Sequence, residues 1–519
     1  MKSLKSKLTL NQAVVANHRN LRFGTAILVS VSLVLASAAV VATSASAAPS
    51  GQLIIANGEP ITAAYYDPHS AFGLVDAQLG SLVFDTLLMM DKNGKLSPSL
   101  ASSYKRVSKT QVNVVVRTGV KFHDGSALTP ADVAASINRV IIKDSPLAFA
   151  LLGAPGKATV DGNTVEIVTD KPFGALENSL AVIAIVPSAD INKPDNWKIK
   201  PNGTGPYSFI SNKNNDLTVT AFADYWGTQP LIKTVILRYI EDTQARQSAL
   251  LTGQVDMSTR VGPQQIKEVK GNSDFNVFSN QGPPSQIISI WTDRGPLKDP
   301  ALRRAISYAI DRKTINTVIQ GKMNNIAYNG MPTNMPFYKD ASEKYSYNPN
   351  RAKSLLKTLG LYNKLTLTMS TSSLVPKQAE IDQAIVGYLK DVGVKVKLTQ
   401  LEVGKFRTTY SDYDMSLNTI ATFNNDPSFA LGIYAGGIGK AVFQWDDAKF
   451  NALFAAQRDD AGSSRAAKVN AAQTYLWNQA RTLWVSDENW VFIVNKRVKN
   501  YTRAPLVGEA LITTASVTG

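Results

Sequence analysis

The sequence predicts an α/β protein with more than one domain. The chain has 519 residues, more than a single hydrophobic core usually contains. Its 44% hydrophobic and 18% charged residues are ordinary for a globular protein and exclude the disordered and fibrous classes. Residues 364–401 read as a strand, a helix with Ile381, Ile385, Tyr388 and Leu389 on one face, and a second strand. A unit of this kind is the crossover of a parallel sheet, so the C-terminal half is expected to be α/β.

Turn and cap residues predict where other strands and helices begin or end. Strands are expected at 51–60 and 110–120, both bounded by glycine turns. Helices are expected to open at Asp299-Pro300 and at Asn348-Pro349, because proline suits the first helical position and Asp or Asn suits the cap.

One stretch resembles a catalytic cluster, "KFHDGSALTPADVAASINR" at 121–139. Asp124 and Gly125 form a turn dipeptide, and Thr129 can cap a helix that carries Asp132 three residues later. We therefore interpret the stretch as scaffold, with His123 in the loop before the helix.

The first 47 residues have the order of a secretory signal. An apolar stretch at 26–42 precedes the small-x-small site Ala45-Ser46-Ala47, so cleavage is expected after Ala47. An uncleaved membrane anchor is the alternative, since about 17 apolar residues are near the lower limit of a span. Five basic residues and no acidic one precede the apolar stretch: Lys2, Lys5, Lys7, Arg19 and Arg22.

The remaining chain would carry a net charge of about +10 instead of +15, spread along its length. A nucleic-acid partner would require a concentrated basic patch and is not expected. The chain has no cysteine, which excludes disulfides, thiolate ligands and a lipid-anchored cysteine. The protein is expected in a periplasm or in a cell-wall or extracellular space.

Catalytic motifs are missing from the sequence. Beyond the signal only His69 and His123 occur, and there is no G-x-S-x-G elbow, H-E-x-x-H pair or P-loop. "GGIGK" at 436–440 lacks the P-loop spacing and its Ser or Thr. We expect no catalytic residue, no cofactor and no metal, although a site made of carboxylates alone is not excluded by sequence.

Three loops instead combine aromatic with small or polar residues, at 63–73, 289–295 and 419–429. Each follows a predicted strand, and loops at the carboxyl ends of strands in α/β sheets are where ligands bind. The alternative is that each aromatic side chain fills the core beside its own loop.

Four motifs occur in the order and spacing of one family: "VKFHDGSALTPADVAASINR", "PNGTGPYSFI", "PLKDPALRRAISYAIDRKTI" and "YNPNRAKSLLKTLG". The chain resembles the family 5 solute-binding proteins of ATP-driven (ABC) importers, the oligopeptide, dipeptide and nickel type, from about residue 52 to about residue 500.

The resemblance implies a two-lobed periplasmic-binding-protein-like clamshell, class II and cluster C, with an extra domain inserted in the first lobe. The lobes would close over a solute, and the closed form would dock on a membrane permease. The implied division is a signal at 1–47, lobe 1 at 48–86, an inserted domain at 87–186, lobe 1 again at 187–285, lobe 2 at 286–484 and a C-terminal return to lobe 1 at 485–519.

The resemblance also bears on the solute. Peptide-binding relatives carry an acidic residue three positions before an Asp/Glu-Pro pair, to hold the free amino group. Here that pair is Asp426-Pro427 and Phe423 stands three residues earlier, while Trp291 replaces a common Asn. A register shift, with Asp426 holding the amino group, is the alternative. The expected ligand-binding residues are Tyr66, Phe72, Thr204, Trp291, Phe423, Asn424, Asn425 and Asp426.

The expected function is a monomeric, non-enzymatic receptor for a peptide or peptide-like solute, which serves an ABC permease. A receptor for an oligosaccharide or a planar or modified compound is the first alternative. A secreted α/β hydrolase is the second, and a receptor repurposed for signalling or chaperoning is the third.

Overall fold

A computed structural model describes residues 49–60, 66–69, 74–91, 95–142, 156–191, 193–373, 375, 377–422, 424–503 and 510–518. The expected signal at 1–47 lies outside these residues. The compact unit Ala47–Gly519 contains every described residue. None of the described helices is long and apolar enough to cross a membrane.

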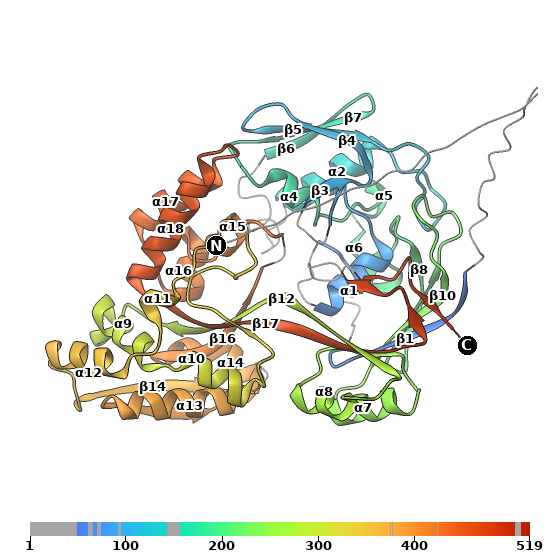
Figure 1. The fold of residues 1–519 in the computed structure, drawn as a ribbon. Coiled ribbons are helices and arrows are strands. Elements are labelled where there is room, and N and C mark those ends of the chain that lie inside the picture. Colours follow the sequence, from blue (N-terminus) through green and yellow to red (C-terminus); the bar gives the residue numbers. More distant parts are fainter. Residues whose placement is uncertain are drawn as a thin grey trace, which may run out of the picture. The chain divides into compact units, whose positions relative to one another are not determined.

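One large mixed sheet of 11 strands organises this unit (Figure 1). Its order is β15-β14-β16-β12-β17-β11-β1-β10-β9-β8, with β13 paired to β17. The strands are β1 (Ser50–Asn57), β8 (Tyr207–Lys213), β9 (Asp216–Ala221), β10 (Ile232–Tyr239), β11 (Met257–Ser258), β12 (Phe275–Ile290), β13 (Asn325–Ile326), β14 (Leu365–Thr371), β15 (Val394–Gln400), β16 (Met415–Ala421) and β17 (Thr482–Asn495).

The described strands of the sheet fall into two halves, which are joined through β12 and β17. We call β1 and β8–β11 the first sheet half and β14–β16 the second sheet half. The start of β12 pairs with the end of β17, and residues 285–289 of β12 pair with the start of β17. The register shifts between Gln281 and Ser285, so the two long strands are irregular where they pass from one half to the other.

A separate four-stranded antiparallel sheet, the small sheet, lies within residues 101–169. Its order is β4-β5-β7-β6, and its core draws on residues from Leu87 to Ile185. Its strands are β4 (Ala101–Arg106), β5 (Gln111–Val116), β6 (Gly156–Asp161) and β7 (Thr164–Thr169). Short pairs complete the strands: β2 (Leu88–Met90) with β3 (Leu96–Pro98), β18 (Val498–Lys499) with β21 (Ser516–Val517), and β19 (Thr502–Arg503) with β20 (Ala510–Leu511).

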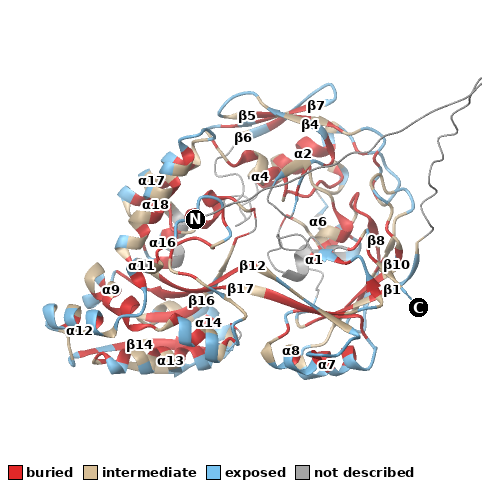
Figure 2. Ribbon diagram, in the orientation of Figure 1, coloured by how far each residue is buried: buried red, intermediate tan, exposed pale blue. Residues whose placement is uncertain are grey.

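Helices cover the sheets, and buried residues concentrate along the strands beneath them (Figure 2). Early in the chain are α1 (Leu74–Val83), α2 (Pro130–Ile142), α4 (Leu176–Leu180), α5 (Ser188–Ile191), α6 (Pro194–Ile199), α7 (Thr243–Leu251) and α8 (Pro263–Val269). The second sheet half has α9 (Pro300–Ala309), α10 (Arg312–Thr314), α11 (Ser342–Tyr345), α12 (Pro349–Thr358), α13 (Gln378–Asp391), α14 (Val403–Thr409), α15 (Pro427–Gly432), α16 (Gly436–Phe443), α17 (Ala448–Arg458) and α18 (Arg465–Gln479).

The predicted crossover is confirmed. β14 and β15 are parallel and α13 connects them. Ile381, Ile385 and Leu389 are fully buried, whereas Tyr388 is only partly buried. The helices predicted after Asp299 and Asn348 also begin there, and both side chains accept hydrogen bonds from backbone N–H groups of the first turn.

The stretch at 121–139 is scaffold, as interpreted. The hydroxyl and the backbone N–H of Thr129 both donate to Asp132, at 2.6 and 2.9 Å, at the start of α2. The His123 ring bonds the carbonyl of Gly205 at 2.9 Å through Nε2. Burial lowers the pKa of His123 to about 4, so the ring is neutral at physiological pH.

Asp382 is a buried carboxyl on α13, the helix that connects β14 and β15. Its side chain has no exposed surface. Burial raises the pKa of Asp382 to about 7, although hydrogen bonds from Thr371 and Gln378 oppose the shift.

The Asp382→Asn variant tests this burial through pH. Because the folded pKa lies above the unfolded value, the folded wild type binds more protons than the unfolded chain between about pH 4 and 7. Wild-type stability should therefore fall across that window as pH rises, whereas the amide does not titrate. The advantage of the variant should grow by on the order of 4 kcal/mol from pH 4 to pH 8. Urea unfolding at both pH values measures it, and an equal advantage at both would contradict the buried charge.

Candidate functional site

The loop after β16 brings three of the predicted site residues together, Asn424, Asn425 and Asp426. Asn424 is fully buried, and its Oδ1 accepts the backbone N–H of Asp426 at 3.2 Å. Asn425 has a φ of 47°, a left-handed conformation that Asn tolerates better than most residues. Asp426 then caps α15, because its Oδ1 accepts the N–H of Ser428 at 2.7 Å.

Asp426 already has a cationic partner. Arg465, at the start of α18, donates from both terminal nitrogens to the two oxygens of Asp426, at 2.8 and 2.6 Å. Arg465 also donates to the hydroxyl of Ser428 at 2.9 Å. Both side chains are almost completely buried, so this is an internal ion pair that fixes the loop.

The structure places Trp291 elsewhere. Trp291 follows the end of β12, which runs antiparallel to β16. The loops after these two strands therefore lie at opposite ends of the strands. The N–H of Trp291 donates to the carbonyl of Asp414, just before β16. Seven-residue β16 therefore separates Trp291 from Asn424 by about 20 Å.

Trp291 has the surroundings of a core residue. It has no exposed surface, and its ring centroid lies 5.5 Å from that of Tyr410. This burial is what the alternative requires, in which an aromatic residue fills the core beside its own loop. Phe423 and Phe72 lie outside the described residues.

Thr204 and Tyr66 lie on the side of the first sheet half. Thr204 is fully buried and donates to Asp85 at 3.0 Å, and the same oxygen of Asp85 accepts Trp226 Nε1 at 2.8 Å. Burial raises the pKa of Asp85 to about 6 despite these donors. Tyr66 is buried against Phe209, with centroids 5.3 Å apart, and burial raises its pKa.

The segment that contains Tyr66 is fixed from the side of the small sheet. Arg139, on α2, donates to both oxygens of Asp67, at 2.8 and 2.7 Å, and lies 2.8 Å from His69 Nδ1. His69 Nε2 lies 2.7 Å from the carbonyl of Ala184. Since a carbonyl only accepts, Nε2 carries the proton and Nδ1 accepts from Arg139.

The partners Asp85, Arg139 and Arg465 were not foreseen from the sequence. They act at a distance along the chain, and no local motif marks them.

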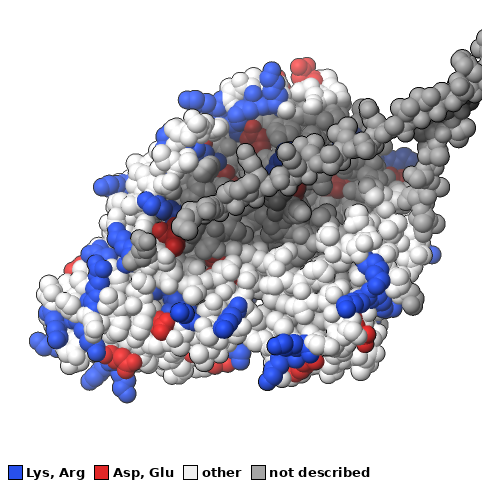
Figure 3. All heavy atoms as spheres, in the orientation of Figure 1, with Lys and Arg blue, Asp and Glu red and all other residues white. Residues whose placement is uncertain are grey.

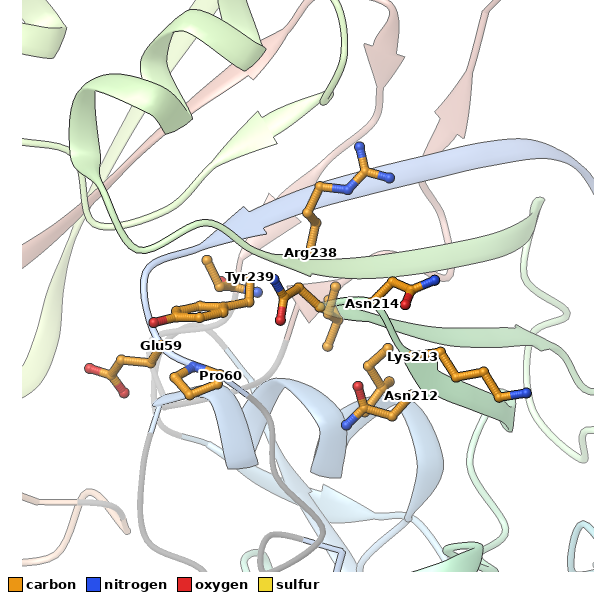
Figure 4. A pocket seen from close by; sticks show the side chains of 11 residues that line it. Glu59, Pro60, Asn212, Lys213, Asn214, Arg238 and Tyr239 are labelled. Atoms are coloured by element: carbon orange, nitrogen blue, oxygen red, sulfur yellow. The ribbon is translucent and has the colours of Figure 1, made fainter.

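A polar pocket of about 180 Å³ lies where β1 and β10 end (Figure 4). Two of its charged groups are paired, Arg238 with Asp216 and Glu59 with Arg260, and Arg238 points away from the other labelled side chains. Its volume corresponds to about six water molecules, less than small-molecule sites usually have. It is lined by Asn57, Glu59, Pro60, Asn212, Lys213, Asn214, Asn215, Leu217, Leu237, Arg238 and Tyr239, none of which was a predicted site residue.

The described residues contain no group of three or more His, Cys, Asp or Glu side chains that could hold a metal ion. Two sheet halves joined by one strand pair, with buried polar loops beside the junction, define a two-lobed binding protein.

Comparison with known proteins identifies its class. Residues 95–441 match the model of the bacterial extracellular solute-binding proteins, family 5, and the chain belongs to this family. It is accordingly a non-enzymatic, solute-binding component of an ABC importer.

Individual relatives and solved structures are similar to this chain over most of its length. The glutathione-binding protein GsiB of Pectobacterium atrosepticum is 27% identical over 471 residues, 88% of this chain and 90% of GsiB. The substrate-binding protein CtaP of Listeria monocytogenes superposes with a TM-score of 0.81 at 23% identity, over 91% of this chain and all of CtaP. AgaA of A. tumefaciens R10, solved with agropinic acid, has a TM-score of 0.78 at 24% identity, over 90% and 99%. The mixed α/β fold is therefore that of the cluster C binding proteins, with the small sheet as its extra element.

The Trp291→Ala variant should lose stability, because it removes a fully buried side chain. We expect a loss of about 3–5 kcal/mol by urea unfolding, as for other Trp and Phe truncations in cores. Ile210→Ala, at a side chain that is 57% exposed, is the control and should change little. Unchanged unfolding together with lost solute binding would show that Trp291 faces the solute instead.

The Asp426→Asn variant should also be destabilised, by about 3–5 kcal/mol, because it leaves Arg465 buried without its counter-charge. Glu380→Gln breaks the exposed pair with Lys377 and should cost at most about 1 kcal/mol. Urea midpoints compare the two. If the Asp426→Asn protein is stable but no longer binds peptides with a free amino group, Asp426 contacts the solute and does not stabilise the loop.

Proposed function

We propose that this protein captures a peptide-like solute between its two sheet halves and delivers it to an ABC permease. Membership of the family supports capture and delivery. The binding of glutathione by the GsiB relative supports a solute that contains amide bonds and carboxylates.

We propose further that the loop at 424–426 does not hold a free amino group. The carboxylate of Asp426 is occupied by Arg465 and by the N–H of Ser428, so it has little capacity to bind an ammonium. Residue 423, where peptide-binding relatives carry an acid, is Phe. Asn424 and Asn425 are the polar groups of this loop nearest to that position, and we keep them as candidate solute contacts together with Phe423, Tyr66, Phe72 and Thr204.

The buried cores support the division into lobes that we propose. Apart from Phe429, one core contains residues from Leu87 to Ile185, which corresponds to an inserted domain at 87–186. A second joins residues 53–84, 184–257 and 490–515, as a lobe that the C-terminus re-enters at 485 would require. Two further cores lie between Ile287 and Val485, in the proposed lobe 2 at 286–484.

We place the mature protein, after removal of residues 1–47, free in a periplasm or cell-wall space as a monomer. The chain has no cysteine to carry a lipid. Basic side chains are prominent over α12 and α13 in Figure 3. Exposed lysines lie on α12, just before β14, on α13 and on β15: Lys357, Lys364, Lys390, Lys395 and Lys397. Such a surface is suited to an anionic envelope and keeps the protein soluble.

Calorimetry with a matched pair of ligands tests the solute proposal. A tetrapeptide with a free amino group and its N-acetylated form should bind within threefold of each other, because no carboxylate is available for the ammonium. In the Phe423→Asp variant the free peptide should gain at least tenfold over the acetylated one. A tenfold preference of the wild type for the free amino group would contradict the proposal.

Native mass spectrometry of protein taken from its own envelope provides the independent check. A co-purified peptide or amide-containing acid supports the proposal. An oligosaccharide or a planar aromatic compound would replace it by the alternative of a non-peptide receptor.

A further inference from the structure

Residues 87–186, which we call the small-sheet region, directly contact the helices and loops that pack on the second sheet half. In sequence, these contacts are far from the β12–β17 junction. The backbone N–H of Gly174 donates to the carbonyl of Arg458, at the end of α17, at 2.6 Å. The side chain of Asn178, on α4, donates to the carbonyl of Asn424 at 3.3 Å.

Gly174 allows this approach because it has no side chain. A Cβ there would lie 2.1 Å from the carbonyl oxygen of Asp460 and 3.2 Å from that of Arg458. The φ of Gly174 is not positive, so the backbone conformation is open to other residues and the contact itself requires glycine.

The receiving loop is held rigid by its own hydrogen bonds. Asp460 accepts from Lys468 and from the N–H of Gly462, both at 2.7 Å, and from the hydroxyl of Ser464. The hydrogen bond from Lys468 holds the pKa of Asp460 well below its usual range, so the carboxylate stays charged at any physiological pH. The carbonyls that meet Gly174 are therefore oriented before contact, which reduces its entropic cost.

An apolar side chain completes the contact. Phe429, on α15 of the second sheet half, is only 5% exposed and belongs to the core that is otherwise built from residues 87–185. This burial can exist only while the small-sheet region and the second sheet half are as close as they are here.

We propose that Gly174, Asn178 and Phe429 form a latch that favours the closed arrangement of the lobes without touching the solute. The small-sheet region is attached to the first sheet half by its chain connections and by the hydrogen bond of His123 to the carbonyl of Gly205, just before β8. Its contact with the second sheet half thus opposes opening about the β12–β17 pair. The affinity for any solute is then proportional to the fraction of molecules in the closed arrangement. The three residues therefore act on solute binding by positioning the lobes. The inference rests on the two-lobed binding function but on no particular solute.

Distance measurements between two spin labels test the latch without solute. Because the chain has no cysteine, Asp161→Cys and Ser354→Cys supply the only two thiols, both at exposed positions of the small sheet and of α12. The parent should show a short-distance population in solute-free protein. Gly174→Val should reduce that population at least twofold and add longer distances.

Two further variants make the result decisive. Gly387→Ala adds a Cβ with no atom within 4 Å, on the exposed side of α13, and should keep the parent distribution. Asn178→Ala removes one hydrogen bond without a clash and should shift the distribution in the same direction as Gly174→Val, which decides the matter if the valine variant does not fold. The latch is overturned if the solute-free parent has no short-distance population, or if the Gly174 and Asn178 variants keep the parent distribution. None of these outcomes depends on what the solute is.

Discussion

The pairing of β12 with β17 is the constraint on which the architecture depends. Among the strands that the structure describes, these two make every strand-to-strand connection between the first and second sheet halves. In the first half, the C-terminal end of β17 pairs with β11. In the second half, the C-terminal end of β12 pairs with β16. If one half moves against the other, the irregular part of the β12–β17 pair is where it can bend, because its register shifts between Gln281 and Ser285 and again between Gln286 and Ile287.

Asp487 holds this irregular point together. Its carboxylate accepts from Gln281 at 3.1 Å and from Ser285 at 2.6 Å, which lie on either side of the Gly282–Pro284 interruption. The backbone and hydroxyl of Thr333 donate to it as well, both at 2.7 Å. Burial raises the pKa of Asp487, yet all four donors favour its charged form. Because a donor left unpaired in such a buried network costs more than the bond itself contributes, the network favours discrete arrangements over continuous bending.

What could be predicted from the sequence was local in the chain. The cap at Thr129 and Asp132 joins residues three apart, and the β14–α13–β15 unit is contained in fewer than 40 residues. The site depended on long-range pairing. Asp426 meets Arg465 across 39 residues, and Asp487 meets Ser285 across 202. Trp291 and the loop at 424–426 both follow strands, but the antiparallel direction of β12 and β16 puts them at opposite ends of these strands, and strand direction leaves no local signature.

The hinge and the latch together limit what a solute has to contribute. A ligand shifts an equilibrium only by its differential affinity for the two states, so every contact that forms on closure without the solute reduces the binding energy that the solute must supply. Polar groups that face a solute need no reactivity for this task, which is consistent with a site region where His69 and His123 bond backbone carbonyls and the acids pair with arginine or hydroxyl donors. If closure is favoured by Gly174, Asn178 and Phe429 at one end and confined by Asp487 at the other, the pocket residues are free to vary with the solute. That separation gives a physical reason why one fold can bind glutathione in the GsiB relative and agropinic acid in the AgaA structure.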